Sequence, residues 1–174
     1  MNYAKILKCD IANGTGFRVS LFVSGCARKC PGCQNQEAQD PDYGKPFDDE
    51  AKAKIYAELE KPYCRGLSLL GGEPMSKLGD IRQTVIALCR EVRERFPDKD
   101  IWMWSGYTYQ ELLADDTANQ IFNYIDYLVD GPFVEGMKDL SLRFRGSANQ
   151  RIVLLRPKVE DVTASFDADR QLPY

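Results

Sequence analysis

Three cysteines close together in the sequence constrain this chain more than any other feature. They are Cys26, Cys30 and Cys33, spaced C-x3-C-x2-C, and they follow the apolar run Phe17–Val23, which is typical of a buried strand. Thiolates this near in sequence can converge on one centre, and such soft ligands suit zinc, copper(I) or an iron–sulfur cluster. A closed zinc site and a fully protein-bound four-iron cluster each need a fourth ligand. The three cysteines therefore predict either a fourth ligand from elsewhere or an iron left open to a small molecule.

Three kinds of site remain open from the spacing alone: an iron–sulfur cluster, a zinc site, and inert or redox-active thiols. The chain contains no histidine, so the fourth ligand of a zinc site would be Cys9, Cys64, Cys89 or a carboxylate. Zinc ligands usually come as C-x2-C pairs, and only Cys30 and Cys33 form one. A disulfide framework fits least, because nothing in the sequence marks secretion and disulfides are rare in cytosolic proteins.

The size and charge of the chain argue against several classes of partner. A length of 174 residues fits one domain, and a net charge of −3 provides no basic field that would attract nucleic acid or an anionic membrane. Residues 1–9 lack the apolar core and cleavage site of a signal peptide, and no apolar run is long enough to span a bilayer. We therefore expect a cytoplasmic protein with reduced thiols and with neither nucleic acid nor membrane as a partner.

Strand-like and helix-like patterns alternate along the chain. Strands are expected over residues 3–10, 17–23, 66–70, 101–104, 127–129 and 152–154, and helices over 49–60, 80–96, from 108 and at 121–124. Asp48 is the expected cap of the first helix, and capping boxes are expected at Asp80 with Gln83 and at Thr108 with Glu111. The alternation predicts an α/β domain with a mainly parallel sheet.

Four turns with chemically useful residues each follow one of these expected strands. They are the cysteine loop, Gly71-Gly72-Glu73-Pro74, Ser105-Gly106-Tyr107 and Asp130-Gly131-Pro132-Phe133. In parallel α/β folds, ligands bind at the edge where the strands end. We therefore expect these turns to gather at one rim. The polar residues 156–174 are expected to form a tail that wraps the surface or is partly disordered.

Taken together, the cysteine loop and the turn Gly71–Pro74 resemble two motifs of the radical S-adenosylmethionine (SAM) enzymes. C-x3-C-x2-C is the signature of that superfamily, and Gly-Gly-Glu-Pro one β–α unit later is similar to its SAM-binding motif. Within the superfamily, the chain resembles the activating proteins of anaerobic (class III) ribonucleoside-triphosphate reductase. Further motifs carry that likeness: Asp10-Ile11 with Asn13-Gly14, Leu21–Cys26, Cys30–Cys33, Lys99–Trp102, Val129–Gly131, and Arg145–Ser147 with Asn149-Gln150.

The resemblance implies a fold, two cofactors and a reaction. Residues 1–155 would form a short partial (β/α) barrel of the radical SAM type, followed by a tail at 156–174. A [4Fe-4S] cluster on Cys26, Cys30 and Cys33 would bind SAM at its fourth iron. Reductive cleavage of SAM to methionine and a 5′-deoxyadenosyl radical would then remove hydrogen from a glycine of the reductase. The implied partners are that reductase, as protein substrate, and a flavodoxin or ferredoxin as electron donor.

The same resemblance implies which residues contact SAM. Gly71 and Gly72 would allow a close approach of its methionine end, and Glu73 would pair with its ammonium group. The backbone from Gly32 to Gln34 would touch the adenine. The full set of implied SAM contacts is Gly32, Cys33, Gln34, Gly71, Gly72 and Glu73. Further candidates for SAM or partner contacts lie in Asp130–Phe133 and Arg143–Gln150.

Two positions depart from the superfamily pattern. Gly32 stands where many members have an aromatic residue, and Gln34 stands where relatives often have an aromatic residue or histidine. The chain is also short for the barrel, so an open site that depends on the partner to exclude water is expected. Alternatives are an activase of another glycyl-radical enzyme, a small radical SAM enzyme acting on a metabolite, and a non-catalytic iron–sulfur or zinc module. Arg28 and Lys29 are expected either to tune the cluster or to form a solvated loop face.

Overall fold

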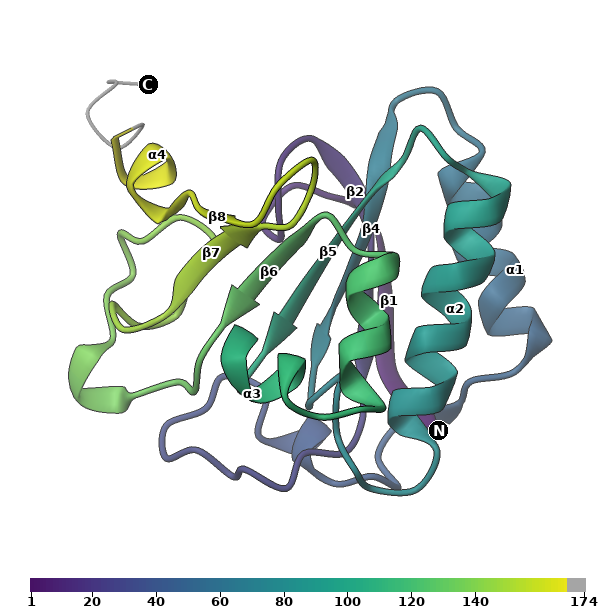
Figure 1. The fold of residues 1–174 in the computed structure, drawn as a ribbon. Helices are drawn as coiled ribbons and strands as arrows, with labels where there is room; N and C mark the ends of the chain where they lie inside the picture. The colour runs from purple at the N-terminus through teal and green to yellow at the C-terminus, as the bar shows by residue number, and fades with distance from the viewer. Residues whose placement is uncertain (169–174) are drawn as a thin grey trace.

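A computed structural model describes residues 1–168 as one eight-stranded sheet with the two longest helices packed on one face (Figure 1). The strands are β1 (Asn2–Asp10), β2 (Phe17–Val23), β3 (Lys45–Pro46), β4 (Cys64–Gly71), β5 (Asp100–Ser105), β6 (Tyr127–Asp130), β7 (Arg151–Leu154) and β8 (Glu160–Asp161). The helices are α1 (Asp49–Leu59), α2 (Ile81–Arg95), α3 (Tyr109–Leu113) and α4 (Thr163–Ala168), with 3-10 turns η1 (Glu37–Gln39), η2 (Ala118–Asn123) and η3 (Glu135–Met137). None of these helices is long and apolar enough to cross a membrane.

The strand order is β3-β1-β2-β4-β5-β6-β7-β8. The central strands β2, β4, β5 and β6 are parallel, and the four pairings at the two edges are antiparallel. The prediction of a mainly parallel sheet is therefore wrong for the described sheet as a whole and right for its centre. Parallel pairing needs a crossover, usually a helix. The turn at 11–16 is too short for a crossover, and the connection at 131–150 contains little helix. The strands on either side of each connection therefore pair antiparallel, β1 with β2 and β6 with β7.

One face of the sheet packs against α1 and α2 through apolar side chains. Alternate residues of the central strands point to this side, as the two-residue period of a strand requires. Fully buried members of this core are Val19, Leu21, Leu67, Leu69, Ile101, Met103, Ile55, Leu59, Val85, Leu88 and Cys89. The core position of Cys89 confirms that it is a buried apolar residue of α2.

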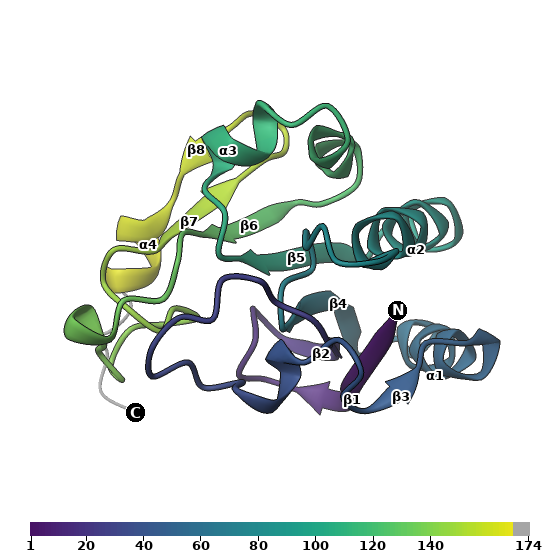
Figure 2. The same ribbon diagram turned by 90° about the horizontal axis from the view of Figure 1, so that it is seen from below.

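The opposite face carries the intervening residues and is covered by loops. Arg18 is fully buried there, where it pairs with Asp100 at 2.6 Å and donates to Ser68 Oγ at 2.7 Å. Trp102 packs edge-on against Phe144, which belongs to the connection between β6 and β7. Figure 2 shows α1 and α2 on one side of the sheet, with the cysteine loop and this connection on the other. The sheet thus separates an apolar core from a region rich in loops.

Helix caps follow the local sequence in two of three cases. Asp48 caps α1 by accepting a hydrogen bond from the Ala51 amide at 2.9 Å, and Thr108 forms the predicted capping box with Glu111. At α2 the predicted box is wrong, because Asp80 makes no side-chain cap. Its carboxylate instead pairs at 2.7 Å with the ammonium group at the start of the chain.

Part of the predicted tail packs onto the sheet. Residues 156–168 contribute β8, which pairs with β7, and α4, whose Phe166 contacts Trp102 edge-on. Residues 169–174 lie outside the described part of the chain. The division of the chain after residue 155 stays a prediction.

Candidate active site

The turns that follow β2, β4, β5 and β6 line one cavity with a volume of ≈ 390 Å³. The cavity lies at the edge toward which the arrowheads of the central strands point (Figure 1). The cysteine loop borders it on one side and residues 131–150 on the other. The structure therefore brings together the four turns that the sequence places at a common rim.

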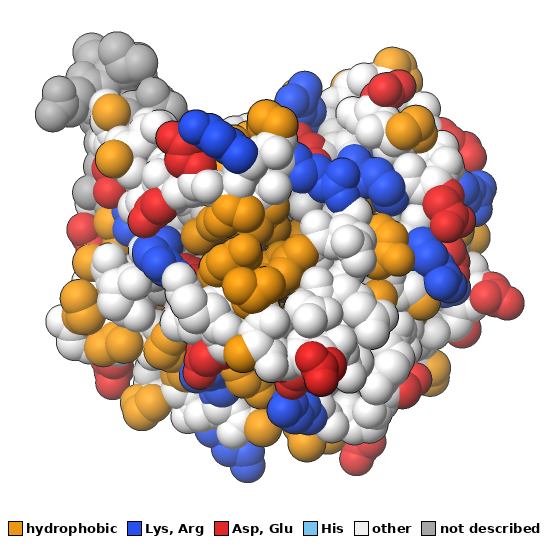
Figure 3. Space-filling view, in the orientation of Figure 1, with side chains coloured by type: hydrophobic (Ala, Val, Ile, Leu, Met, Phe, Trp, Pro, Cys, Tyr) orange, Lys and Arg blue, Asp and Glu red, His pale blue; other side chains and the backbone are white. Residues whose placement is uncertain are grey.

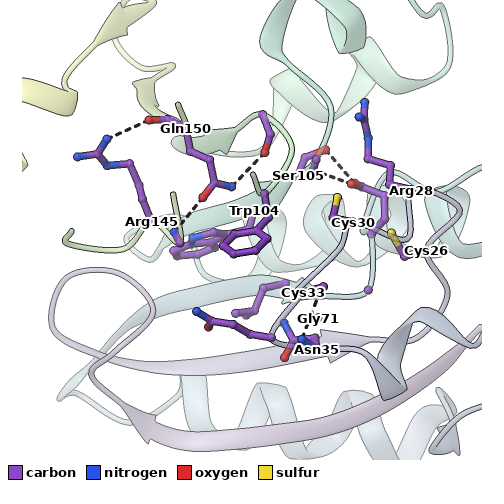
Figure 4. A pocket seen from close by; sticks show the side chains of 18 of the residues that line it. Cys26, Arg28, Cys30, Cys33, Asn35, Gly71, Trp104, Ser105, Arg145 and Gln150 are labelled. Atoms are coloured by element: carbon purple, nitrogen blue, oxygen red, sulfur yellow. Dashed lines mark hydrogen bonds between the residues drawn. The ribbon is translucent and has the colours of Figure 1, made fainter. Parts of the chain in front are cut away.

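All three cysteines of the C-x3-C-x2-C loop line this cavity as free, partly exposed thiols. Figure 4 shows them at one end of the cavity, with Trp104 between them and Arg145. Burial raises the pKa of the Cys26 thiol, although the backbone amides of Arg28 and Lys29 act in the opposite direction. A protonated Cys26 is therefore favoured until a bound cation displaces the proton.

The chemistry of the donors bears on the kind of metal site. Three thiolates with an open fourth position suit a four-iron cluster, whereas a structural zinc site is closed by four protein ligands. Cys26, Cys30 and Cys33 are also the only cysteines of the described chain on the cavity lining. The residues present fit a [4Fe-4S] cluster with one open iron better than a zinc site.

The Gly-Gly-Glu turn is fastened to the start of the cysteine loop. The Gly72 amide donates to Val23 O at 2.8 Å, and the Glu73 amide donates to Gly25 O at 3.0 Å. A Cβ on Gly71, which has φ +110°, would lie 2.6 Å from Val23 O, and one on Gly72 would lie 2.8 Å from Gly25 O. The chain itself therefore requires both glycines. Both also line the cavity, and their approach to SAM stays a prediction.

Glu73 joins the turn after β4 to the turn after β5. Its Oε1 accepts from the Met75 amide at 2.9 Å and from Ser105 Oγ at 2.8 Å, and its Oε2 accepts from the Gly106 amide at 2.7 Å. Burial raises the pKa of this carboxyl, while these hydrogen bonds and Arg28 lower it. Three donors from the chain thus already bind the carboxylate that the sequence assigns to the SAM ammonium, and that pairing stays a prediction.

The remaining predicted contacts separate into two groups. Cys33 and Gln34 line the cavity. Gly32 is not among the lining residues, and a Cβ on it would lie 2.6 Å from Glu135 Oε1 of η3. Gly32 therefore faces the neighbouring loop, where an aromatic side chain would collide with Glu135.

Known proteins with similar sequences identify the family of this chain. A family model described as a 4Fe-4S single cluster domain matches residues 12–153. Three similar proteins carry the name anaerobic ribonucleoside-triphosphate reductase-activating protein. The one from Vibrio cholerae is 44% identical over 154 residues, which is 87% of this chain and 97% of that protein. The one from Escherichia coli K12 is 41% identical over 160 residues, which is 90% of this chain and 100% of that protein. The one from bacteriophage T4 is 37% identical over 152 residues, which is 87% of this chain and 93% of that protein. This chain belongs to the family of these activating proteins.

Several lining residues of this activating protein were not predicted from its sequence. They are Ala12, Asn13, Asn35, Gln39, Leu70, Trp104, Leu140 and Leu142. Trp104 carries a usable signal, because it lies two residues after Trp102 and so on the same face of β5. Its Nε1 donates to Phe144 O at 2.7 Å, which fixes the indole in the cavity wall.

The Arg28 side chain of this activating protein packs against other side chains and is not part of a solvated loop face. Its guanidinium lies 4.3 Å from the centre of the Tyr107 ring and 3.4 Å from the Glu111 carboxylate. Its Nε is buried without a hydrogen-bond partner among the described residues. The side chain lines the cavity close to the cysteines, where its positive charge acts on whatever binds there.

The far wall of the activating protein's cavity is built by two segments that hold each other. Gln150 Nε2 donates to Gly131 O at 3.0 Å, and Asn149 Nδ2 donates to Pro132 O at 2.8 Å. The buried Arg145 donates to Gln150 O at 3.0 Å and forms an ion pair with Asp167. These contacts give Asp130–Phe133 and Arg143–Gln150 a shared structural role, and direct contact with SAM or a partner stays a prediction for both.

Proposed function

We propose that this chain activates an anaerobic ribonucleoside-triphosphate reductase by forming a radical on a glycine of that enzyme. The observation that carries the proposal is the trio of free cysteines on the wall of a cavity that also contains the Gly-Gly-Glu turn. Three thiolates without a fourth protein ligand suit a cluster that binds a small molecule at its open iron. The names of the similar proteins agree with this reaction.

In this proposal, Cys26, Cys30 and Cys33 hold a [4Fe-4S] cluster, and SAM occupies the cavity beside Cys33, Gln34, Gly71, Gly72 and Glu73, with the backbone of Gly32 nearby. When bound, the cluster and SAM would supply reductive cleavage of a C5′–S bond, with one electron from an external donor, as the chemistry that removes hydrogen from the glycine Cα. The chain positions them: the turn at Gly71–Glu73 is tied to the cysteine loop, so both walls keep a fixed spacing. Trp104 and Phe144 reduce the access of water from the far side.

The proposal extends to organisation and partners. Residues 1–155 would be the radical SAM domain, with the parallel centre of the sheet as a shortened partial (β/α) barrel, and 156–174 the C-terminal tail. A flavodoxin or ferredoxin would supply the electron, in the cytoplasm, where thiols stay reduced. Neither nucleic acid nor a membrane has a part in this reaction.

Anaerobic reconstitution tests the cluster. The wild-type protein should take up about four irons per chain and turn brown. Cys30→Ser should lose both the iron and the colour. Cys9→Ser is the matched control, because Cys9 is an exposed thiol outside the cavity, and it should keep them. One tightly held zinc without visible absorption would contradict the proposal.

Two further measurements test the reaction. Wild-type protein with reductant and SAM should release 5′-deoxyadenosine, and Cys30→Ser should not. After incubation with an anaerobic ribonucleoside-triphosphate reductase, that reductase should show the EPR signal of a glycyl radical. Cleavage of SAM without any radical on the reductase would point instead to another glycyl-radical enzyme or to a metabolite as the substrate.

A further inference from the structure

A protein substrate reaches the cysteines only through the mouth of the cavity. A volume of ≈ 390 Å³ has room for a single small ligand. A folded domain cannot enter such a space, so a macromolecular substrate has to present a narrow, extended segment at the mouth. This step rests on the proposed function, and it makes the surface around the mouth the place where a partner is recognised.

The cysteine side of the mouth carries several uncharged polar side chains. The lining on this side contains the carboxamide side chains of Asn13, Gln34, Asn35 and Gln39. Each carboxamide offers both donors and an acceptor, as a peptide bond does, and can therefore pair with an extended backbone.

The charged side chains of the lining already have partners within the chain. Arg28 lies against Glu111, Arg145 pairs with Asp167, and the Glu73 carboxylate accepts three hydrogen bonds. Asp139 accepts from Ser141. A strongly charged segment would have to displace these contacts, so the lining favours a neutral one.

The opposite side of the mouth is apolar and exposed. Leu140 lines the cavity although 83% of its surface is accessible to solvent. Val134 and Met137 are exposed next to it in sequence, and we name these three residues the apolar rim. Figure 3 shows hydrophobic side chains on the outside of the molecule at its lower left edge, where Figure 1 places η3. Leu140 lines the cavity, whereas Val134 and Met137 lie outside its lining on the segment that leads to Leu140. Several large apolar side chains exposed on one segment beside a cavity are typical of an interaction site.

The apolar rim is also held in place, although it lies in a long connection. The Ala148 amide donates to Met137 O at 2.9 Å, and the Val134 amide donates to Ser147 Oγ at 3.2 Å. Lys138 and Ser147 form an antiparallel bridge between the two halves of the connection. A surface ordered before binding loses less conformational entropy when a partner docks.

We propose that the apolar rim docks the glycine-bearing segment of the reductase as an extended, uncharged peptide. An apolar side chain close to the glycine packs on Leu140, and the peptide backbone crosses the mouth toward the carboxamides of the cysteine side. The glycine Cα is then directed into the cavity, where SAM binds under the proposed function.

Leu140→Asp tests this docking, and Val159→Asp is its matched control. Val159 is 54% exposed, lies outside the cavity lining, and loses the same apolar character. With wild-type reductase, Leu140→Asp should bind about tenfold or more weakly and form proportionally less glycyl radical at limiting concentration. Met137→Asp, on the apolar rim but outside the cavity lining, should also weaken reductase binding, while its release of 5′-deoxyadenosine without reductase stays at the wild-type level. Leu140→Met should restore binding, and Val159→Asp should behave as wild type throughout.

Two results would overturn the docking proposal. The first is wild-type affinity for the reductase in Leu140→Asp. The second is parallel loss of SAM cleavage and reductase binding in Met137→Asp, which would show that the apolar rim acts through the cofactor site. Failure of the proposed function looks different: the wild-type protein would then form no glycyl radical on the reductase, whatever the state of residue 140.

Discussion

Where α1 and α2 cover the sheet, the centre of the layer is a cluster of apolar side chains, whereas the loop-covered face buries an arginine. Leu21, Leu69 and Met103 on the helix side are fully buried members of that cluster. On the loop side, Arg18 is equally buried but is held by an ion pair, hydroxyl and carbonyl groups. The same strands thus supply both a close-packed core and a set of directional contacts.

The difference teaches where stability and positioning reside. Dispersion and burial on the helix side are spread over many atoms and have no preferred direction. Hydrogen bonds on the loop side join specific atoms. Arg18 donates to Thr15 O in the turn before β2, and Glu73 joins the turn after β4 to the turn after β5. We therefore expect changes on the helix side to lower stability alone, and changes on the loop side to alter the site as well.

The largest effect is expected for Arg18→Met. Removal of the buried guanidinium leaves the Asp100 carboxylate with only the exposed Arg65 and takes the donors away from Ser68 Oγ and Leu67 O, which should lower the free energy of unfolding by about 3–5 kcal/mol. Arg65 contacts the same Asp100 at 3.0 Å from an exposed position, so Arg65→Met is the control and should cost about 0–1 kcal/mol. Urea unfolding of the apo-protein measures both. Equal costs for the two variants would remove the contrast between the faces.

A somewhat smaller effect is expected for Leu69→Ala on the helix side. The cavity left in the core should lower the free energy of unfolding by about 2–5 kcal/mol. Iron uptake per folded chain and SAM affinity should stay at the wild-type level, because Leu69 faces away from the cavity. Leu113→Ala, at a half-exposed position, is the control for loss of the same side chain. A change of SAM affinity in folded Leu69→Ala would show that the two faces are coupled.

The smallest effect is expected for Glu73→Gln, and it should depend on pH. The amide cannot accept from all three donors, and the lost hydrogen bond should cost about 1–3 kcal/mol. Because burial raises the pKa of Glu73 above its ordinary 4.5, the folded state holds the proton more tightly than the unfolded state. The stability that Glu73 contributes is therefore greatest at low pH and falls as pH rises through the raised pKa.

The measurement is the unfolding free energy of wild type minus that of Glu73→Gln, followed between about pH 5 and pH 8. The difference should shrink as pH rises. A difference that grows with pH would mean that the hydrogen bonds to the carboxylate outweigh the effect of burial.

Local sequence patterns predicted the features that depend on local physics. The bounds of β2, the Asp48 cap and the capping box at Thr108 follow from side-chain period and cap chemistry, which act over a few residues. The ion pair of Asp80 with the start of the chain joins groups about 80 residues apart, and no local rule anticipates it. The antiparallel pairing of β1 with β2 agrees with the hairpin that the short turn between residues 10 and 17 allows, whereas the antiparallel edge at β7 and β8 was missed, since it depends on how the long connection 131–150 returns.

The candidate site shows the same division. The cysteines and the Gly-Gly-Glu turn were identified because their residue types and spacing carry chemistry within a few positions. Asn13, Gln39 and Leu142 carry no such spacing, and only the folded chain brings them to the cavity. Glu73 was recognised as important, but its contacts with Ser105 and Gly106 lie on a neighbouring strand and its turn, which sequence reasoning did not connect to it.

The far wall of the cavity has a consequence for the order in which this protein is made. A ribosome releases the cysteine loop roughly a hundred residues before the connection at 131–150, which is about 5–20 s of synthesis. Phe166 and Asp167, which hold Trp102 and Arg145, emerge later still. Until residues 131–150 have been synthesised, the three thiols of the nascent chain face a cavity without its far wall. A carrier that delivers iron and sulfide has wider access to the thiols at that stage than in the finished protein.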